Sequence, residues 1–295
     1  MPKIVPALFP TLFGAVALAI LWQYHGAPVV GWLMICLWII ATTSYLTRVA
    51  IDPSIISRDL DTLPGRTGLT AMNLTLMLVA GLVGTRWLLL GQIALIAALL
   101  IQCALVFAVG RRILRADATG KMVQPVWQMV FTGFVVAIPA AAGVGSLPLA
   151  QTLLGVSVVM ALAIWGLTAA MFAQNRFPPP QLRPTLAIHL SPAAMIGIGG
   201  IACGYPMIGT VFFGISVAIF VALVIKMGWL TAHGFSPFWG SFTFPFVAFA
   251  SLSFFVTPWL GWLLLCIATL LITMIAVRIL RMWGDGVLGT MTFAA

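Results

Sequence analysis

The chain has 295 residues, of which 62% are hydrophobic and only 6% are charged, and it contains no glutamate. About a quarter of the residues of a soluble domain are charged, so this composition excludes a soluble fold. Apolar stretches of roughly 20 residues, the length of a helix that crosses a bilayer, recur along the whole chain. These stretches are continuous rather than alternating, which excludes a transmembrane barrel.

Hydropathy, with breaks at charged residues and at clusters of proline and glycine, predicts ten transmembrane helices. No soluble domain is left over, so we predict one transmembrane domain over residues 1–295 of an all-α integral membrane protein. Lys3 before the first apolar stretch is typical of a signal peptide, but Pro6, Pro10 and the missing cleavage site favour a retained helix. In chain order the predicted spans are 4–24, 28–47, 65–83, 86–109, 124–142, 149–172, 185–203, 206–228, 237–255 and 258–280.

The connections between the predicted spans are alternately short and long, so the chain forms five helical hairpins. All lysines and arginines except Arg86 lie at the termini or on the side of the long connections. The positive-inside rule therefore predicts that both termini are cytoplasmic, which an even number of spans also requires. The net charge of +9 is mainly a topology signal, and it also favours accumulation of cytosolic anions at the inner mouth.

Proline and glycine are concentrated in the first helix of each hairpin, whereas the second helices are plainer and rich in leucine. Proline inside a helix frees a carbonyl and kinks the axis, which lipid tolerates poorly unless protein or water covers the defect. We therefore expect the odd helices to surround a central pore and the even helices to face lipid. The alternative is that these residues only mark close helix packing. The expected pore-kink or pore-lining residues are Pro10, Gly14, Gly68, Gly133, Pro139, Pro192, Gly197 and Pro245.

The predicted spans contain no aspartate or glutamate. Proton relays and cation filters normally use intramembrane carboxylates, so their absence argues against a cation channel or a carboxylate-based proton pump. Anions can be bound without formal charge by freed backbone N–H groups, hydroxyls and the positive ends of helix dipoles. Small anions are therefore the expected ligands, and the candidate polar residues on inner spans are Thr11, Thr67, Thr70, Asn73, Thr132, Ser191 and Thr243.

The histidines and cysteines predict neither a metal site nor a cofactor site. His25 and His233 are expected to be solvated. His189, just before Ser191, is a candidate pH sensor near the cytoplasmic mouth, with a hydrogen-bonded structural role as the alternative. The cysteines stand alone in apolar runs, without the spacing of a metal site or disulfide framework, and they are Cys36, Cys103, Cys203 and Cys266.

Two motifs resemble the tellurite-resistance/dicarboxylate transporter family, which includes bacterial TehA and the plant guard-cell slow anion channels. The ten-span hairpin pattern extends this resemblance over essentially the full chain. The motifs are Arg183-Pro184-Thr185 with Leu190-Ser191-Pro192-Ala193-Ala194, and Phe238-Trp239-Gly240-Ser241-Phe242-Thr243-Phe244-Pro245.

The resemblance implies a homotrimer in a bacterial inner membrane, in contact with membrane lipids and without a nucleic-acid partner. Each protomer would contain its own pore, lined by the five odd helices and blocked midway by a phenylalanine. Matching the Thr-Phe-Pro part of the second motif implies that this gate is Phe244, with Phe242 as the alternative in a register shifted by two. The plant channels carry long phosphorylatable termini, which this chain lacks, so kinase gating of that kind is not expected.

Three functions are compatible with these features. The first is a channel or channel-like transporter for small anions, with carboxylates, nitrate, chloride and tellurite oxyanions as candidates. The second is a proton-coupled transporter of C4-dicarboxylates, for which His189 is the titratable candidate. The third is a membrane enzyme built on the carboxylate cluster Asp52, Asp59 and Asp61, although a charged connection of this kind usually positions helices. We expect the first function.

Overall fold

The computed structural model describes residues 3–116 and 123–292, and within these two segments all regular structure is helical. In the described residues, nine helices are long and apolar enough to cross a membrane. They are η1–α1 (Pro6–Tyr24), α2 (Val30–Ile51), α4 (Leu63–Gly84), α5 (Leu88–Arg115), α8 (Leu147–Ala173), η3–α9 (Pro180–Ala202), α10 (Pro206–Ile225), η4–α12 (Pro237–Val256) and α13 (Pro258–Gly284). Three short helices lie in connections or at the tail: α3 (Ser54–Asp61), α11 (Met227–Leu230) and α14 (Val287–Met291).

The expected fifth span, 124–142, is broken into three short helical segments. These are α6 (Trp127–Phe131), the 3-10 turn η2 (Gly133–Val136) and α7 (Ala137–Gly143). None of them alone reaches the roughly 20 residues that a continuous membrane helix needs. Of the ten predicted transmembrane helices, nine are found in the described residues and the fifth corresponds to this segmented element, so the count of ten is not confirmed.

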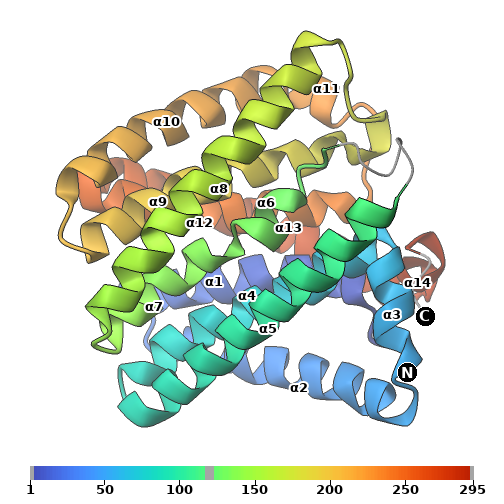
Figure 1. Cartoon of the computed structure of the whole chain (residues 1–295), viewed down its shortest axis with the longest axis horizontal. Helices are drawn as coiled ribbons and strands as arrows, with labels where there is room; N and C mark the ends of the chain where they lie inside the picture. The colour runs from blue at the N-terminus through green and yellow to red at the C-terminus, as the bar shows by residue number, and fades with distance from the viewer. Residues whose placement is uncertain (1–2, 117–122, 293–295) are drawn as a thin grey trace.

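The two chain ends lie at one end of the molecule, beside α3 and α14 (Figure 1). We call this the terminal end, and we call the opposite end, where short turns join the two helices of each hairpin, the turn end. Gly145 and Gly204 lie in two of these turns with φ angles of 83° and 84°, a conformation that favours glycine. Lys121, which contributes to the predicted charge asymmetry, lies outside the described residues.

Burial separates the first and second helices of the hairpins. In an apolar 18-residue stretch of each of the four odd spans that are long enough to cross a membrane, 61–78% of residues are buried, against 17–33% in each even member. The even helices expose leucine, isoleucine and valine along their outer faces, as expected for helices in contact with lipid. The prediction that odd helices are inner and even helices are outer is confirmed.

Several inner spans share one local feature, a 3-10 segment of 3 to 10 residues that continues into an α-helix. This occurs at η1 (Pro6–Leu8) before α1 (Phe9–Tyr24), at η3 (Pro180–His189) before α9 (Leu190–Ala202), and at η4 (Pro237–Phe242) before α12 (Thr243–Val256). Prolines occupy the first turn of the α-helical part, where a missing N–H removes no intrahelical hydrogen bond. The prolines that the sequence suggested as mid-helix kinks therefore lie at junctions of 3-10 and α-helical segments. These first-turn prolines are Pro10, Pro139, Pro192 and Pro245.

Gln102 of the outer helix α5 donates hydrogen bonds to backbone carbonyls at the break in the fifth span. Its side chain is fully buried, and Nε2 donates to Val130 O at 2.6 Å and to Met129 O at 3.4 Å. Its Oε1 accepts a hydrogen bond from Asn73 Nδ2 at 2.9 Å. Carbonyls freed by the break are thereby satisfied inside a region where lipid offers no partner.

Replacement of Gln102 by leucine is expected to lower the free energy of unfolding by about 1–3 kcal/mol, because buried polar groups lose their partner. The measurement is thermal unfolding of the purified protein in detergent. Gln151→Leu is the matched control, since Gln151 donates only to an exposed tyrosine hydroxyl of Tyr205. Equal stability of Gln102→Leu and wild type would mean that other groups satisfy these carbonyls.

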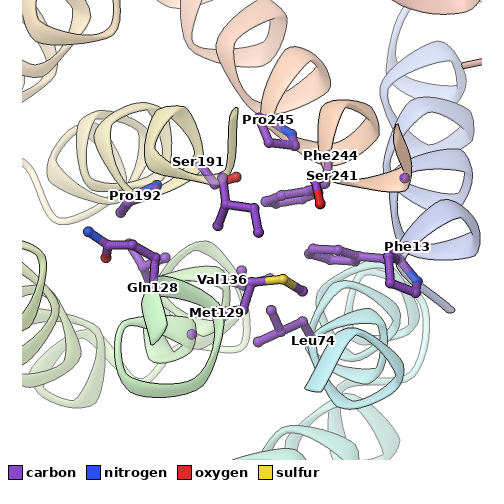
Figure 2. A pocket seen from close by; sticks show the side chains of 15 residues that line it. Phe13, Leu74, Gln128, Met129, Val136, Ser191, Pro192, Ser241, Phe244 and Pro245 are labelled. Carbon is purple, nitrogen blue, oxygen red and sulfur yellow. The ribbon is translucent and has the colours of Figure 1, made fainter. Parts of the chain in front are cut away.

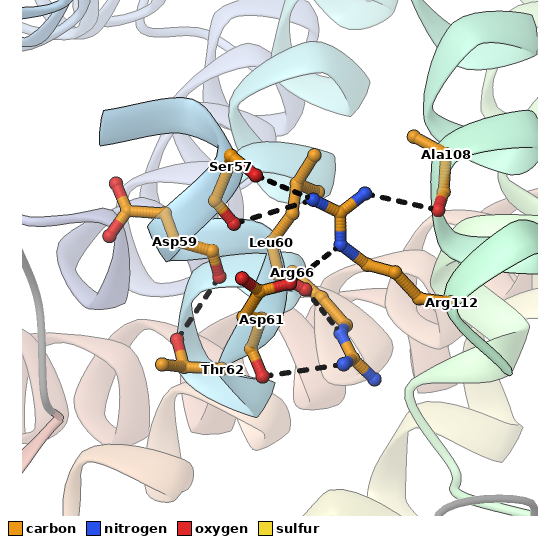
Figure 3. Close-up of polar contacts among 8 residues, drawn as sticks. All are labelled: Ser57, Asp59, Leu60, Asp61, Thr62, Arg66, Ala108 and Arg112. Carbon is orange, nitrogen blue, oxygen red and sulfur yellow. Dashed lines mark hydrogen bonds and ion pairs between the residues drawn. The ribbon is translucent and has the colours of Figure 1, made fainter. Parts of the chain in front are cut away.

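At the terminal end, polar contacts fix α3 against the beginnings and ends of longer helices (Figure 3). Arg112 of α5 donates Nε–H to Asp61 Oδ1 at 2.8 Å and also contacts Ser57. Arg66 of α4 donates to Leu60 O at 2.6 Å. The expectation that this charged connection positions helices agrees with these contacts.

Candidate conduction path

Two cavities lie between the inner helices, one behind the other along the helix axes. The turn-side cavity has a volume of about 440 Å³ and is lined by later residues of α1, α4, α9 and α12. The terminal-side cavity is much tighter, about 30 Å³, which is room for little more than one water molecule. Its lining comes from the early residues of the same helices and from the broken fifth span, and it includes Pro10, Gln128, Gly133, Ser191, Ser241 and Pro245.

Phe244 is the side chain that lines both cavities. It is the second residue of α12 and is 6% exposed. Its ring stacks on Phe13 of α1, with ring centroids 3.8 Å apart and planes 19° from parallel. Figure 2 shows the two rings side by side at the edge of the terminal-side cavity. Phe244 therefore borders both cavities, and the ring of Phe13 packs against it beside the terminal-side cavity.

The seam between α1 and α12 positions these rings. Gly14 lies one residue after Phe13, and a Cβ atom there would lie 2.2 Å from Thr243 Oγ1 and 2.8 Å from Phe244 N. The Thr243 hydroxyl donates to Pro10 O at 3.1 Å and to Gly240 O at 2.7 Å. The two helices can approach this closely only because residue 14 has no side chain.

Phe242, the alternative gate, has a different environment. It is the last residue of η4, is 2% exposed, and packs edge-on against Trp239 with ring centroids 5.7 Å apart. It lines neither of the two cavities. Of the two candidates, Phe244 is the one in contact with the axial cavities.

The predicted pore-kink residues divide into two groups. Pro10, Gly133, Pro192 and Pro245 line the terminal-side cavity. The others line neither axial cavity: a Cβ on Gly14 would meet Thr243, on Gly68 it would meet Pro6, and on Gly197 it would meet Leu252, while Pro139 lies in the first turn of α7. For these three glycines the structure favours close helix packing, the alternative reading of the sequence.

Polar groups at the terminal-side cavity come from three residues. Ser191 was among the expected polar residues, whereas Gln128 and Ser241 were not. Most of the other expected residues bond to nearby helical groups instead, as Thr67 does with Leu63 O and Thr70 with Arg66 O, both at 2.8 Å. The sequence signal that could have identified Gln128 is a polar glutamine within a predicted span that has no charged residue, because such a side chain rarely faces lipid.

His189, the candidate pH sensor, is 8% exposed and lines neither axial cavity. Its Nδ1 lies 3.5 Å from Gln128 Nε2, and the Gln128 Oε1 accepts a hydrogen bond from Thr132 at 2.7 Å. The histidine therefore reaches the terminal-side cavity only through Gln128. His189 therefore does not border the axial cavities, and its Nε2 is buried without a hydrogen-bond partner among the described residues.

The three clustered aspartates do not converge on one site. Asp52 pairs with Arg58 at 2.8 Å, and hydrogen bonds from Ser54 and Arg58 lower the pKa of this exposed carboxyl to about 2. Asp59 is 1% exposed and accepts a hydrogen bond from Tyr45 at 2.7 Å, while Asp61 pairs with Arg112. Across residues 3–116 and 123–292, no group of three histidines, cysteines or acidic residues could hold a metal ion.

The fold and the axial cavities define a class: a multi-pass helical membrane protein with two cavities between its inner helices. Comparison with protein-family models matches residues 3–283 to SLAC1, described as voltage-dependent anion channel. The match covers nearly the whole chain, so the protein belongs to this family of anion channels. A search of curated protein sequences finds no match.

Proposed function

We propose that the protein is a channel or channel-like transporter for small anions, gated by Phe244. The observation that carries the proposal is that this one side chain lines both axial cavities, so its ring is the barrier between them. Phe13 holds the ring in place through the stacked contact. A narrow apolar constriction blocks ions both by its size and by exclusion of water.

Selectivity for anions follows from the groups around the terminal-side cavity. Helices α1, α9 and α12 begin beside it, and each helix N-terminus carries roughly half a positive charge. Ser191, Ser241 and Gln128 add uncharged polar groups. No aspartate of residues 3–116 and 123–292 lies in an inner span, so within these segments no carboxylate opposes the helix dipoles there.

The alternative function is a proton-coupled dicarboxylate transporter. The reversal potential distinguishes this transporter from a passive anion channel. We expect the reversal potential of purified protein in planar bilayers to follow the gradient of chloride, nitrate or malate and to be independent of a pH gradient. A reversal potential that tracks the pH gradient would instead establish proton coupling. The Phe244→Ala variant is measured in parallel because the closed ring pair limits wild-type current.

The proposal includes orientation and assembly. The terminal end is cytoplasmic because the positive charges of the described residues gather there, with Arg86 as the exception on the turn side.

The protein is a homotrimer in a bacterial inner membrane, as the family resemblance implies, with membrane lipid on the exposed faces of the even helices. Its physiological anion belongs to the carboxylates or small oxyanions, with dicarboxylate transport and tellurite resistance as the roles to test. Mass measurement of the native complex tests the trimer.

A further inference from the structure

His25 lies at the turn-end mouth of the path and is partly buried, contrary to the expectation of a solvated loop residue. It caps the C-terminus of α1 and lines the turn-side cavity. Its ring packs against Phe254 of α12 in a tilted arrangement, with centroids 3.9 Å apart and planes 34° from parallel, and the rings of His25 and Trp262 of α13 are edge-to-face with centroids 5.3 Å apart. Phe254 and Trp262 also contact each other at 5.3 Å, so the three rings form one aromatic cluster.

The hydrogen bonding of His25 leaves one ring nitrogen available. Nδ1 lies 2.9 Å from Leu21 O, and because a carbonyl only accepts, Nδ1 carries a hydrogen. The hydrogen bonds found among the described residues leave Nε2 without a protein partner. Uptake of a proton at Nε2 therefore converts this atom from an acceptor into a charged donor at the edge of the cavity.

The surroundings of His25 are the C-terminal end of a helix and two aromatic rings. The carbonyls at the C-terminus of α1 present the negative end of the helix dipole. Aromatic faces attract a cation, and here both Phe254 and Trp262 lie within reach.

Few other charged or titratable groups lie at this end. On the elements packed against the end of α1, the described turn-end groups are Tyr24 beside it, Cys36 on α2, Cys266 on α13 and Arg86 after α4, while α12 has none. Of these residue types only histidine changes charge between about pH 5 and pH 8.

We propose that His25 is a proton-dependent binding site for small anions at the turn-end mouth of the conduction path. This inference rests on the proposed anion conduction. When Nε2 is protonated, its N–H binds an anion such as chloride, nitrate or a carboxylate and raises the local anion concentration in the turn-side cavity. Anion current rises as the pH on that side falls, while the reversal potential stays that of the anion, because the proton is bound and not transported.

The test uses the full chain in planar bilayers, with Phe244→Ala as the background so that current is measurable. Lowering the pH of the turn-side solution from about 8 to about 5 is expected to raise chloride current about threefold or more. His25→Gln in this background is expected to abolish the rise. His25→Arg, which carries a permanent charge, is expected to give a high current without pH dependence. His233→Gln is the matched control, since His233 is exposed near the terminal end, and it should retain the rise.

The outcomes separate this inference from the proposed function. Absence of anion current in both Phe244→Ala and Phe242→Ala would overturn anion conduction itself. Anion current that remains but does not change with pH, or that changes equally in His25→Gln, would overturn the role of His25 alone. Thermal unfolding of each variant in detergent shows whether a loss of current is a loss of folded protein. If His25→Gln folds poorly, His25→Arg decides the test. An anion current of His25→Arg that still rises as the pH falls would contradict the proposal.

Discussion

Phe244→Ala is expected to turn a nearly silent protein into one that passes large anion-selective currents. Alanine removes the ring shared by the two axial cavities and leaves Phe13 without its stacked partner. Each 1.4 kcal/mol removed from a barrier corresponds to about a tenfold higher rate, so the current should rise by about tenfold or more. The measurement is macroscopic current through planar bilayers at equal amounts of reconstituted protein.

Phe242→Ala is the control for this experiment, because Phe242 is a buried ring two residues away that lines neither axial cavity. It should lower stability, by about 3–5 kcal/mol for a large buried ring, without raising the current. Phe13→Ala should give an intermediate current, because the Phe244 ring stays but loses the contact that holds it. A larger current from Phe242→Ala than from Phe244→Ala would move the gate to the other register.

The hairpin architecture could be predicted because each of its causes is local in the sequence. Leucine-rich second helices such as α5 and α13 tolerate lipid on most faces, whereas helices with proline and glycine need protein cover. The motif Thr243-Phe244-Pro245 likewise carried the resemblance to a gated pore. The phenylalanine that lines both cavities is the one that the motif match selected.

What could not be predicted depends on contacts between distant segments. Gly133 and Pro139 predicted a kink in the fifth span but not its division into three segments, because Gln102, which bonds to the carbonyls of that span, lies in another helix about 30 residues away. The environment of His25 depends on Phe254 and Trp262, more than 200 residues later. A short loop sequence with one histidine is typically solvated, and only the packing of α1 against α12 and α13 changes that.

The seam at Gly14 leads to the second large effect. We expect Gly14→Ala to lower the free energy of unfolding by about 1–3 kcal/mol, because the new methyl overlaps Thr243 and the backbone of Phe244 and drives α1 from α12. Gly155→Ala on α8 is the matched control, since a Cβ there meets nothing within 4 Å and alanine favours a helix over glycine by about 1 kcal/mol. The measurement is thermal unfolding in detergent, together with bilayer current.

Gly14→Ala should also raise the resting current, because the same shift separates the rings of Phe13 and Phe244. Adding Thr243→Gly removes the atoms nearest the new methyl. The double variant should therefore be more stable than Gly14→Ala and should pass less resting current, since mutations in contact are not additive. If Gly14→Ala were as stable as Gly155→Ala and equally silent, the close approach of α1 and α12 would not determine the position of the gate. A coupled change in stability and leak would instead mean that helix packing at one glycine sets the closure of the whole path.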